Sequence, residues 1–180
     1  MRLILILLIT LNLSAGIKEN MINLYQDLKY KEACDMGFRN FQNNKRDEDY
    51  VSLYAFSCLN SDFIDRLTVP IATLKHSKEA RSNSAYFSII LMQKKLLYHA
   101  LIDGYEISHL NLPSTEYVLS KVFDFYSKLG KHEKRELYLF EDTNDKKLTY
   151  KLYILNNSPL GKIVIEEFYD TISIKRHVYW

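Results

Sequence analysis

Apolar side chains recur with helical spacing over the first two thirds of the chain. Residues 20–43 predict one helix, whose apolar stripe falls at i, i+3, i+4, i+7, i+8 and i+11: Tyr30, Ala33, Cys34, Gly37, Phe38 and Phe41. Asp47 is a good N-cap for the next helix, because its carboxylate can accept from the first free N–H groups. Residues 50–59 are apolar on nearly every side, so we expect this helix to be central, with Leu53 and Phe56 in the core.

Two further helices follow the same periodicity. Residues 62–74 predict a helix that Pro70 should kink or shorten, since proline lacks an N–H donor. The longest helical pattern covers residues 78–103, and Gly104 supplies the glycine that commonly ends a helix.

A last helical segment precedes a change in character. Residues 115–129 keep apolar side chains in register, with Ser114 as the expected cap and Gly130 as the stop signal. The charged run 131–136 then reads as a solvated linker, which we take as the boundary between a helical and a β-rich part.

Short segments rich in Val, Ile, Thr and Tyr, separated by turn residues, predict a small antiparallel β meander after residue 130. A competing interpretation makes residues 160–174 a helix, because Glu166, Glu167 and Asp170 tolerate one; we favour strands. The predicted strands are 137–140, 148–155, 162–169 and 171–179.

The expected fold class is therefore α+β, mainly α: a stack of antiparallel helical hairpins followed by a small antiparallel β meander. The expected organisation is a signal peptide over residues 1–16, a helical domain over 17–130 and a β-rich portion over 131–180.

The N-terminus has the features of a secretory signal peptide. Arg2 provides the positive start, Leu3 to Leu13 carry no charge, and small residues follow. Cleavage is expected near Ala15 or Gly16, which places the mature protein in the periplasm or outside the cell. The apolar run is shorter than the roughly 20 residues that a membrane-spanning helix needs.

A second apolar stretch, residues 85–102, is interrupted by Gln93, Lys94 and Lys95. Because a charged residue at the centre of a bilayer costs about 3 kcal/mol on insertion scales, we expect a buried helix and no integral membrane segment.

Charge changes the list of expected partners. Without Arg2 the chain carries 23 basic and 22 acidic side chains, so net charge suggests neither nucleic acid nor an anionic membrane surface. Hydrophobic residues make up 47% of the chain, which argues for a folded core.

The chain has two cysteines, Cys34 and Cys58, and export would expose them to an oxidising compartment. Cys34 lies eleven residues before the proposed turn near Lys45, and Cys58 thirteen after it. In an antiparallel hairpin such positions lie at about the same height, so we predict a Cys34–Cys58 disulfide. The alternative is two buried thiols that only pack.

Residues 28–38, LKYKEACDMGF, resemble part of a tetratricopeptide or Sel1-like helical repeat, with an aromatic residue and Lys-Glu-Ala opening a helix. The resemblance covers about one repeat, within residues 20–60, and no 34-residue period recurs. It implies a scaffold that binds protein or peptide through a concave face, and it carries over no binding residue.

Candidate chemistry is sparse. His99 and Asp103 are four residues apart on one helix and could share a ligand, but two donors do not close a metal site. Cys58 lies in the apolar sequence FSCL, an unfavourable setting for a nucleophilic thiolate. The acidic pairs Glu166–Glu167 and Asp142–Asp145 are expected to be solvated, and no phosphate-binding glycine motif or hydrolase motif occurs.

We therefore expect an exported, non-catalytic interaction or scaffold protein of the cell envelope that binds a protein or peptide, with no cofactor. The alternatives are a small envelope hydrolase with an unrecognised active site and a structural subunit of a larger assembly. A pocket with two or more titratable side chains would favour the hydrolase.

Overall fold

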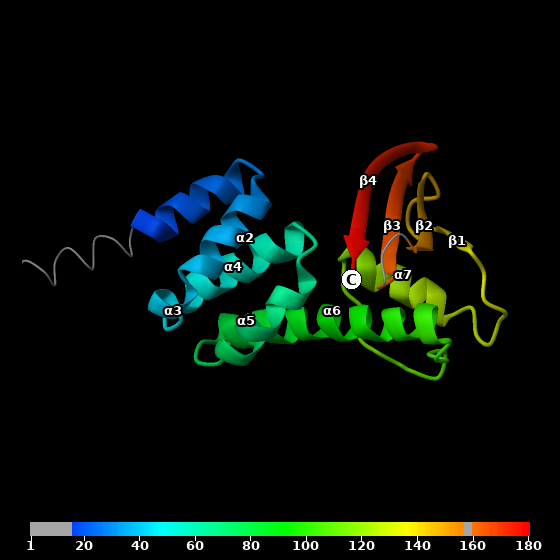
Figure 1. Ribbon diagram of the computed structural model, residues 1–180, viewed down its shortest axis with the longest axis horizontal. Helices are drawn as coiled ribbons and strands as arrows, with labels where there is room; N and C mark the ends of the chain where they lie inside the picture. Colours follow the sequence, from blue (N-terminus) through cyan, green and yellow to red (C-terminus); the bar gives the residue numbers. More distant parts are fainter. Residues whose placement is uncertain (1–15, 157–159) are drawn as a thin grey trace, which may run out of the picture. The chain divides into compact units, whose positions relative to one another are not determined.

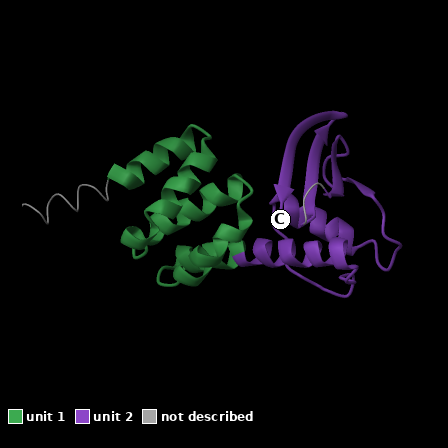
Figure 2. Cartoon of the chain, in the orientation of Figure 1, with its two compact units in different colours: residues 1–87 green, residues 88–180 purple. Residues whose placement is uncertain are grey.

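The computed structural model describes residues 16–156 and 160–180. It divides the chain into two compact units, Met1–Phe87 and Ser88–Trp180 (Figure 2). This division falls inside a long helix, whereas the boundary predicted near residue 131 coincides with the change from helix to strand. All of the predicted signal peptide except Gly16 lies outside the described residues.

Helices make up the described part of the first unit (Figure 1). A helix over residues 16–26 precedes α2 (Tyr30–Arg39), α3 (Phe41–Asn44), α4 (Glu48–Asn60), the 3-10 helix η1 (Ile64–Leu67), α5 (Thr68–Thr73) and the first part of α6 (Lys78–Asp103).

The single helix predicted over residues 20–43 is wrong, because the chain breaks it twice. At the first break Leu28 adopts a left-handed conformation with φ 60°, and the N–H of Lys29 donates to the carbonyl of Leu24 at 2.9 Å. This is the hydrogen-bond pattern that closes a helix. At the second break the side chain of Asn40 donates to the carbonyl of Met36 at 2.9 Å, a local bond that competes with continuation of the helix.

Helix α4 provides the centre of the first unit, as predicted. Asp47 is confirmed as its N-cap, since the carboxylate accepts from the N–H groups of Asp49 and Tyr50, each at 3.1 Å. Leu53 and Phe56, however, are only half-buried, so the prediction that they are core residues is wrong. When a helix is apolar on every side, its sequence does not indicate which side packs against neighbouring helices. The buried apolar side is formed by Tyr50, Val51, Tyr54, Ala55, Cys58 and Leu59.

Pro70 shortens the helix predicted over residues 62–74. The segment begins as the 3-10 helix η1, and Pro70 is the third residue of the six-residue α5. A proline is tolerated in a first turn, where its missing N–H would have no partner within the helix.

The second unit combines helices with a sheet (Figure 1). The rest of α6 is followed by α7 (Val118–Ser127) and the strands β1 (Leu137–Glu141), β2 (Leu148–Leu155), β3 (Lys162–Tyr169) and β4 (Ile172–Tyr179). The strands pair antiparallel in the order β1-β2-β3-β4, which confirms the meander and the α+β, mainly α fold class. The helical alternative for residues 160–174 is wrong.

Helix α6 has the predicted bounds, and both predicted glycine stops are confirmed. Gly104 and Gly130 have φ values of 73° and 66°, in the region that side chains disfavour. Ser114 is not the cap of α7. The cap position is Tyr117, and the N–H of Thr115 donates to the Ser120 hydroxyl at 2.7 Å.

Aromatic side chains of α7 pack on one face of the sheet. The ring of Phe125 stacks on Phe140 with centroids 5.7 Å apart, and Tyr126 meets Tyr138 edge-on at 5.1 Å. We call this the inner face. No helix in the described parts of the chain is long and apolar enough to cross a membrane. In α6, Lys94 is buried and donates to the main-chain oxygen of Trp180.

Candidate binding surface on the sheet

The opposite face of the sheet, which we call the outer face, gathers side chains from all four strands. Paired residues of neighbouring strands share a face, and side chains alternate along each strand. One cross-strand row is Leu139, Lys151, Glu166 and Arg176, and Tyr153 and Phe168 stand on the same face in adjoining rows.

Two ammonium groups on this face lie over aromatic rings. Nζ of Lys151 is 4.1 Å from the centroid of the Phe168 ring, and Nζ of Lys162 is 5.1 Å from the ring of Trp180. Attraction between a cation and an aromatic quadrupole is worth about 0.5–1 kcal/mol at exposed sites. This attraction therefore orders the long lysine side chains on the surface, and the lysines keep a positive charge that no carboxylate among the described residues balances.

A polar triad fixes the middle of the outer face. The Tyr153 hydroxyl donates to Oε1 of Glu166 at 3.0 Å, while Arg176 places Nε 3.3 Å from the same oxygen and donates from Nη2 to the Tyr153 hydroxyl at 3.3 Å. The negative charge of Glu166 is thereby balanced by the positive charge of Arg176. Lys151 and Lys162 have no carboxylate partner within the described residues, so the surface presents unpaired positive charge.

Apolar exposure completes the surface. Leu139 is 66% exposed and Trp180, the only tryptophan of the chain, is 53% exposed. Large apolar and aromatic side chains beside ordered cations are typical of the residues that dominate protein interfaces.

The inner face holds a different set of polar groups. His177 is 1% exposed and its Nε2 lies 2.9 Å from Oε1 of Glu167. The Tyr150 hydroxyl donates to Oδ2 of Asp142 at 2.7 Å, and Asp142 is 6% exposed. The expectation that both acidic pairs are solvated is therefore wrong, because Asp142 is buried and Glu166 and Glu167 bond to neighbouring strands.

The hydrogen bonds of Asp142 explain how a buried carboxylate stays ionised. Burial disfavours its charge, but the N–H of Asn144, the Tyr150 hydroxyl and the charge of Lys121 outweigh burial and hold the pKa below its usual value. Burial, together with its bond to Asp142, raises the pKa of Tyr150. The hydrogen bond between Tyr150 and Asp142 holds the β1–β2 turn against the sheet.

A cavity of about 360 Å³ lies beside the ends of α6 and α7 and is lined by titratable side chains. The hydroxyl of Ser108 donates to the carboxylate of Glu106. His132, in the same cavity, has both ring nitrogens engaged: Nδ1 lies 2.8 Å from the Gly130 carbonyl oxygen and Nε2 3.2 Å from the Tyr138 hydroxyl. His132 therefore has no nitrogen available to serve as a general base in this geometry.

The sequence-based ligand pair His99 and Asp103 is brought together, but the two side chains bond to each other. Nδ1 of His99 lies 2.8 Å from Oδ2 of Asp103, and the imidazole stacks on Tyr105 with centroids 4.6 Å apart. Within the described residues, no three His, Cys, Asp or Glu side chains are grouped so that they could hold a metal ion.

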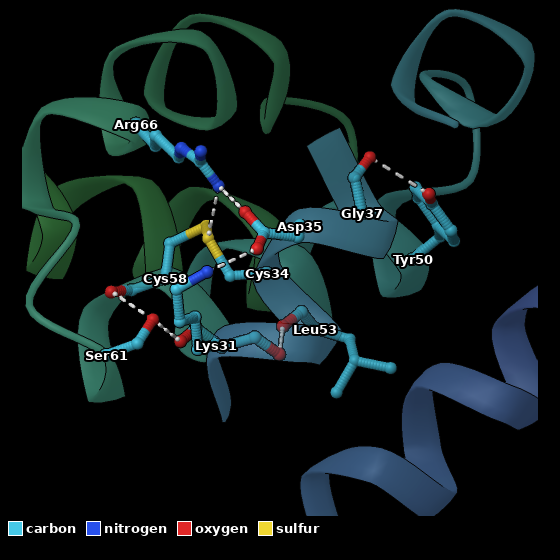
Figure 3. The surroundings of a disulfide bond; sticks show 10 residues. Lys31, Cys34, Asp35, Gly37, Tyr50, Leu53, Cys58, Ser61 and Arg66 are labelled. Carbon is cyan, nitrogen blue, oxygen red and sulfur yellow. Dashed lines mark hydrogen bonds and ion pairs between the residues drawn. A yellow bond between two sulfur atoms is a disulfide. The ribbon is translucent and has the colours of Figure 1, made fainter. Parts of the chain in front are cut away.

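Cys34 and Cys58, the pair expected from the sequence, are joined in the structure (Figure 3). Their sulfur atoms are 2.09 Å apart and their Cα atoms 4.7 Å apart, and both residues are fully buried. The bond ties α2 to α4, and it leaves Cys58 no free thiol for nucleophilic chemistry. Residues 30–38 of the segment compared with helical repeats form most of α2 at this junction.

Sequence reasoning missed the outer face. Its signal was present as alternation in β2 and β3, but Lys151 and Phe168 are recognisable as neighbours only when the pairing register of the strands is known.

Comparison with models of protein families, with curated proteins and with solved structures finds no match to this chain.

Proposed function

We propose that this chain is an exported binding protein without catalytic activity, and that it engages a protein or peptide partner through the outer face of its sheet. The observation that carries the proposal is the ordered group of Tyr153, Phe168 and Trp180, each in contact with a cation on a solvent-facing surface. Rigid aromatic anchors and pre-ordered cations lower the entropy that a partner must overcome.

Site-specific photocrosslinking in the native cells tests the surface. A photoreactive residue replaces Leu139 on the outer face, and a matched control replaces Leu28 in the first unit, which is similarly exposed at 69%. We expect one discrete crosslinked partner from position 139, and loss of that product when Lys151→Glu and Arg176→Glu are added. Equal products from both positions, or none from position 139, would contradict the proposal.

Export is the second part of the proposal. The Cys34–Cys58 pair at bonding distance supports an oxidising compartment, where such bonds persist. N-terminal sequencing of the native protein is expected to begin at Gly16 or Ile17. Recovery of the chain from the cytoplasm with Met1 intact would contradict export.

The cavity beside Glu106, Ser108 and His132 favours the second candidate, a small hydrolase, because it gathers titratable side chains. Because both His132 nitrogens are engaged in hydrogen bonds, we propose binding ahead of hydrolysis. A Ser108→Ala variant that abolishes hydrolysis of ester or peptide substrates by the purified protein would reverse this order.

A further inference from the structure

Strand β4 is an edge strand of the sheet, and the side chains of its first half are exposed to solvent. It pairs with β3 along one side, and no strand among residues 16–156 and 160–180 pairs with its other side. Residues 172–176 are all exposed, and Ile172 and Ile174 are 70% and 56% exposed. The free side of an edge strand presents unpaired N–H and C=O groups, which are a template for pairing with another strand.

The turn before this edge is held in an unfavourable conformation. Asp170 and Thr171 both have positive φ values, 46° and 73°, although neither is glycine. Positive φ at both positions is what a two-residue hairpin turn requires, although a β-branched residue such as Thr171 rarely adopts this region. The turn joins β3 to β4 in a tight hairpin (Figure 1), and Ile172 is the first residue of β4 after it.

Charge decides which strand this edge can accept. Lys175 and Arg176 follow Ile174, which is an extra residue in β4 opposite the step from Glu167 to Phe168. If two copies of β4 paired about the middle of the strand, Lys175 would lie opposite Arg176 of the copy, and like charges across a ladder are destabilising. An acidic strand would instead find a favourable partner.

The positive charge of Lys175 is available for that purpose. Arg176 is bonded to Glu166. Lys175 lies opposite Glu167 in the ladder, but that carboxylate is bonded to His177, and Lys175 forms no ion pair among the described residues. The other edge, β1, is only five residues long and ends at the exposed Glu141, which would repel an acidic segment. Of the two edges, β4 is therefore the one that fits such a partner.

Resting on the proposed function, we infer that the partner is an extended acidic segment of another protein, which adds to β4 as a fifth strand. Its main chain pairs with the open edge, a carboxylate meets Lys175, and apolar side chains cover Ile172 and Ile174. This is the strand-addition mode of peptide recognition, in which the main chain supplies affinity and side chains supply specificity.

Fluorescence of Trp180, which follows β4 directly, provides the measurement on the full chain. The probe is an alternating Glu-Val peptide as long as β4, with an alternating Lys-Val peptide as control. We expect binding of the acidic peptide alone. Lys175→Glu should weaken it about tenfold, the equivalent of about 1.4 kcal/mol, while the matched reversal Lys146→Glu, in the exposed β1–β2 turn, should leave it unchanged.

A third peptide separates this inference from the proposed function. Methylation of every backbone nitrogen in the Glu-Val peptide removes the hydrogen-bond donors of both its edges and keeps its side chains, and we expect it not to bind. Equal binding of the methylated peptide would overturn strand addition while leaving side-chain docking on the outer face intact. Three other outcomes would overturn the inference: equal binding of the Lys-Val peptide, no binding of the acidic peptide, or a dimer of the protein that the peptide dissociates. Loss of the Leu139 crosslink would overturn the proposed function itself.

Discussion

Arg66 and Asp35 form an ion pair in the first unit, and the guanidinium makes three further contacts. Nη1 of Arg66 lies 2.7 Å from Oδ1 of Asp35 and donates to Sγ of Cys34 at 3.2 Å (Figure 3). The guanidinium also stands over the rings of Phe38 and Phe63, at 5.0 and 4.7 Å. One side chain thus joins the end of the η1 helix to the disulfide-bearing face of α2.

Replacing Arg66 by alanine should lower the free energy of unfolding by about 1–2 kcal/mol, since it removes a charge-assisted hydrogen bond and two cation–π contacts. Arg66→Lys should restore little, because an ammonium lacks the planar donors of a guanidinium. Lys31→Ala, which removes the exposed Lys31–Asp35 pair and a longer cation–π contact to Phe63 at 5.8 Å, should cost less, about 0.5 kcal/mol. Urea unfolding measures all three, and equal losses for Arg66→Ala and Lys31→Ala would contradict this account.

The disulfide should contribute about 3 kcal/mol, because it closes a loop between residues 24 apart and restricts the unfolded chain. The Cys34→Ser, Cys58→Ser double variant is expected to show this loss in urea unfolding. Thiol titration of the native protein, denatured without reductant, should find no free thiol. Two free thiols per chain would show that the bond does not form in the cell.

Helix α2 approaches α4 closely at Gly37. A Cβ atom at this position would lie 2.5 Å from Cδ2 of Tyr54, and the Gly37 carbonyl accepts from the Tyr50 hydroxyl at 3.0 Å. Gly37→Ala should therefore destabilise the protein by about 1–3 kcal/mol, the usual cost of overpacking. The penalty should shrink in a Tyr54→Ala background, where the colliding ring is absent; an unchanged penalty would mean that the clash is not its cause.

Glu48 anchors the segment that leads into α6. Its carboxylate accepts from the N–H groups of His76, Lys75 and Ser77 at 2.7–2.8 Å, and these bonds lower its pKa from 4.5 to about 2. Because the folded pKa is depressed, the stabilisation is present above pH 4.5 and is lost as the pH falls toward 2.

Glu48→Gln should therefore lower the thermal unfolding midpoint at neutral pH, and the difference from the native sequence should vanish near pH 2. The control Glu133→Gln replaces an exposed carboxylate and should change the midpoint little at neutral pH. A constant difference between pH 7 and pH 2 for Glu48→Gln would show that the charge of Glu48 is not responsible.

Thr171→Gly should stabilise the protein by about 1 kcal/mol, since glycine adopts a positive φ without the strain that threonine carries there. The neighbouring Ser173→Gly provides the control. It lies in β4, where glycine is unfavourable, so it should destabilise by about 0.5–1 kcal/mol. Chemical unfolding distinguishes the two, and a loss of stability in Thr171→Gly would refute the strain.

The sequence by itself determined features that depend on neighbours in the chain. Asp47 caps α4, Gly104 and Gly130 end their helices, and alternating Val, Ile and Tyr residues make strands, because each effect arises within a few residues. Local bonding also explains why the helix predicted over residues 20–43 is interrupted. The backbone is left-handed at Leu28, and the side chain of Asn40 bonds to a main-chain carbonyl, so the helix ends where periodicity alone would continue it.

Only the tertiary structure decided which side of α4 is buried and which side chains meet across the sheet. Leu53 and Tyr54 are both large, but packing against α2 covers Tyr54 and leaves Leu53 half-buried. Lys151 meets Phe168 because the β2–β3 register places Thr149 opposite Phe168, and a slip of one residue would send Lys151 to the inner face. The candidate surface depends on this register, which long-range pairing fixes.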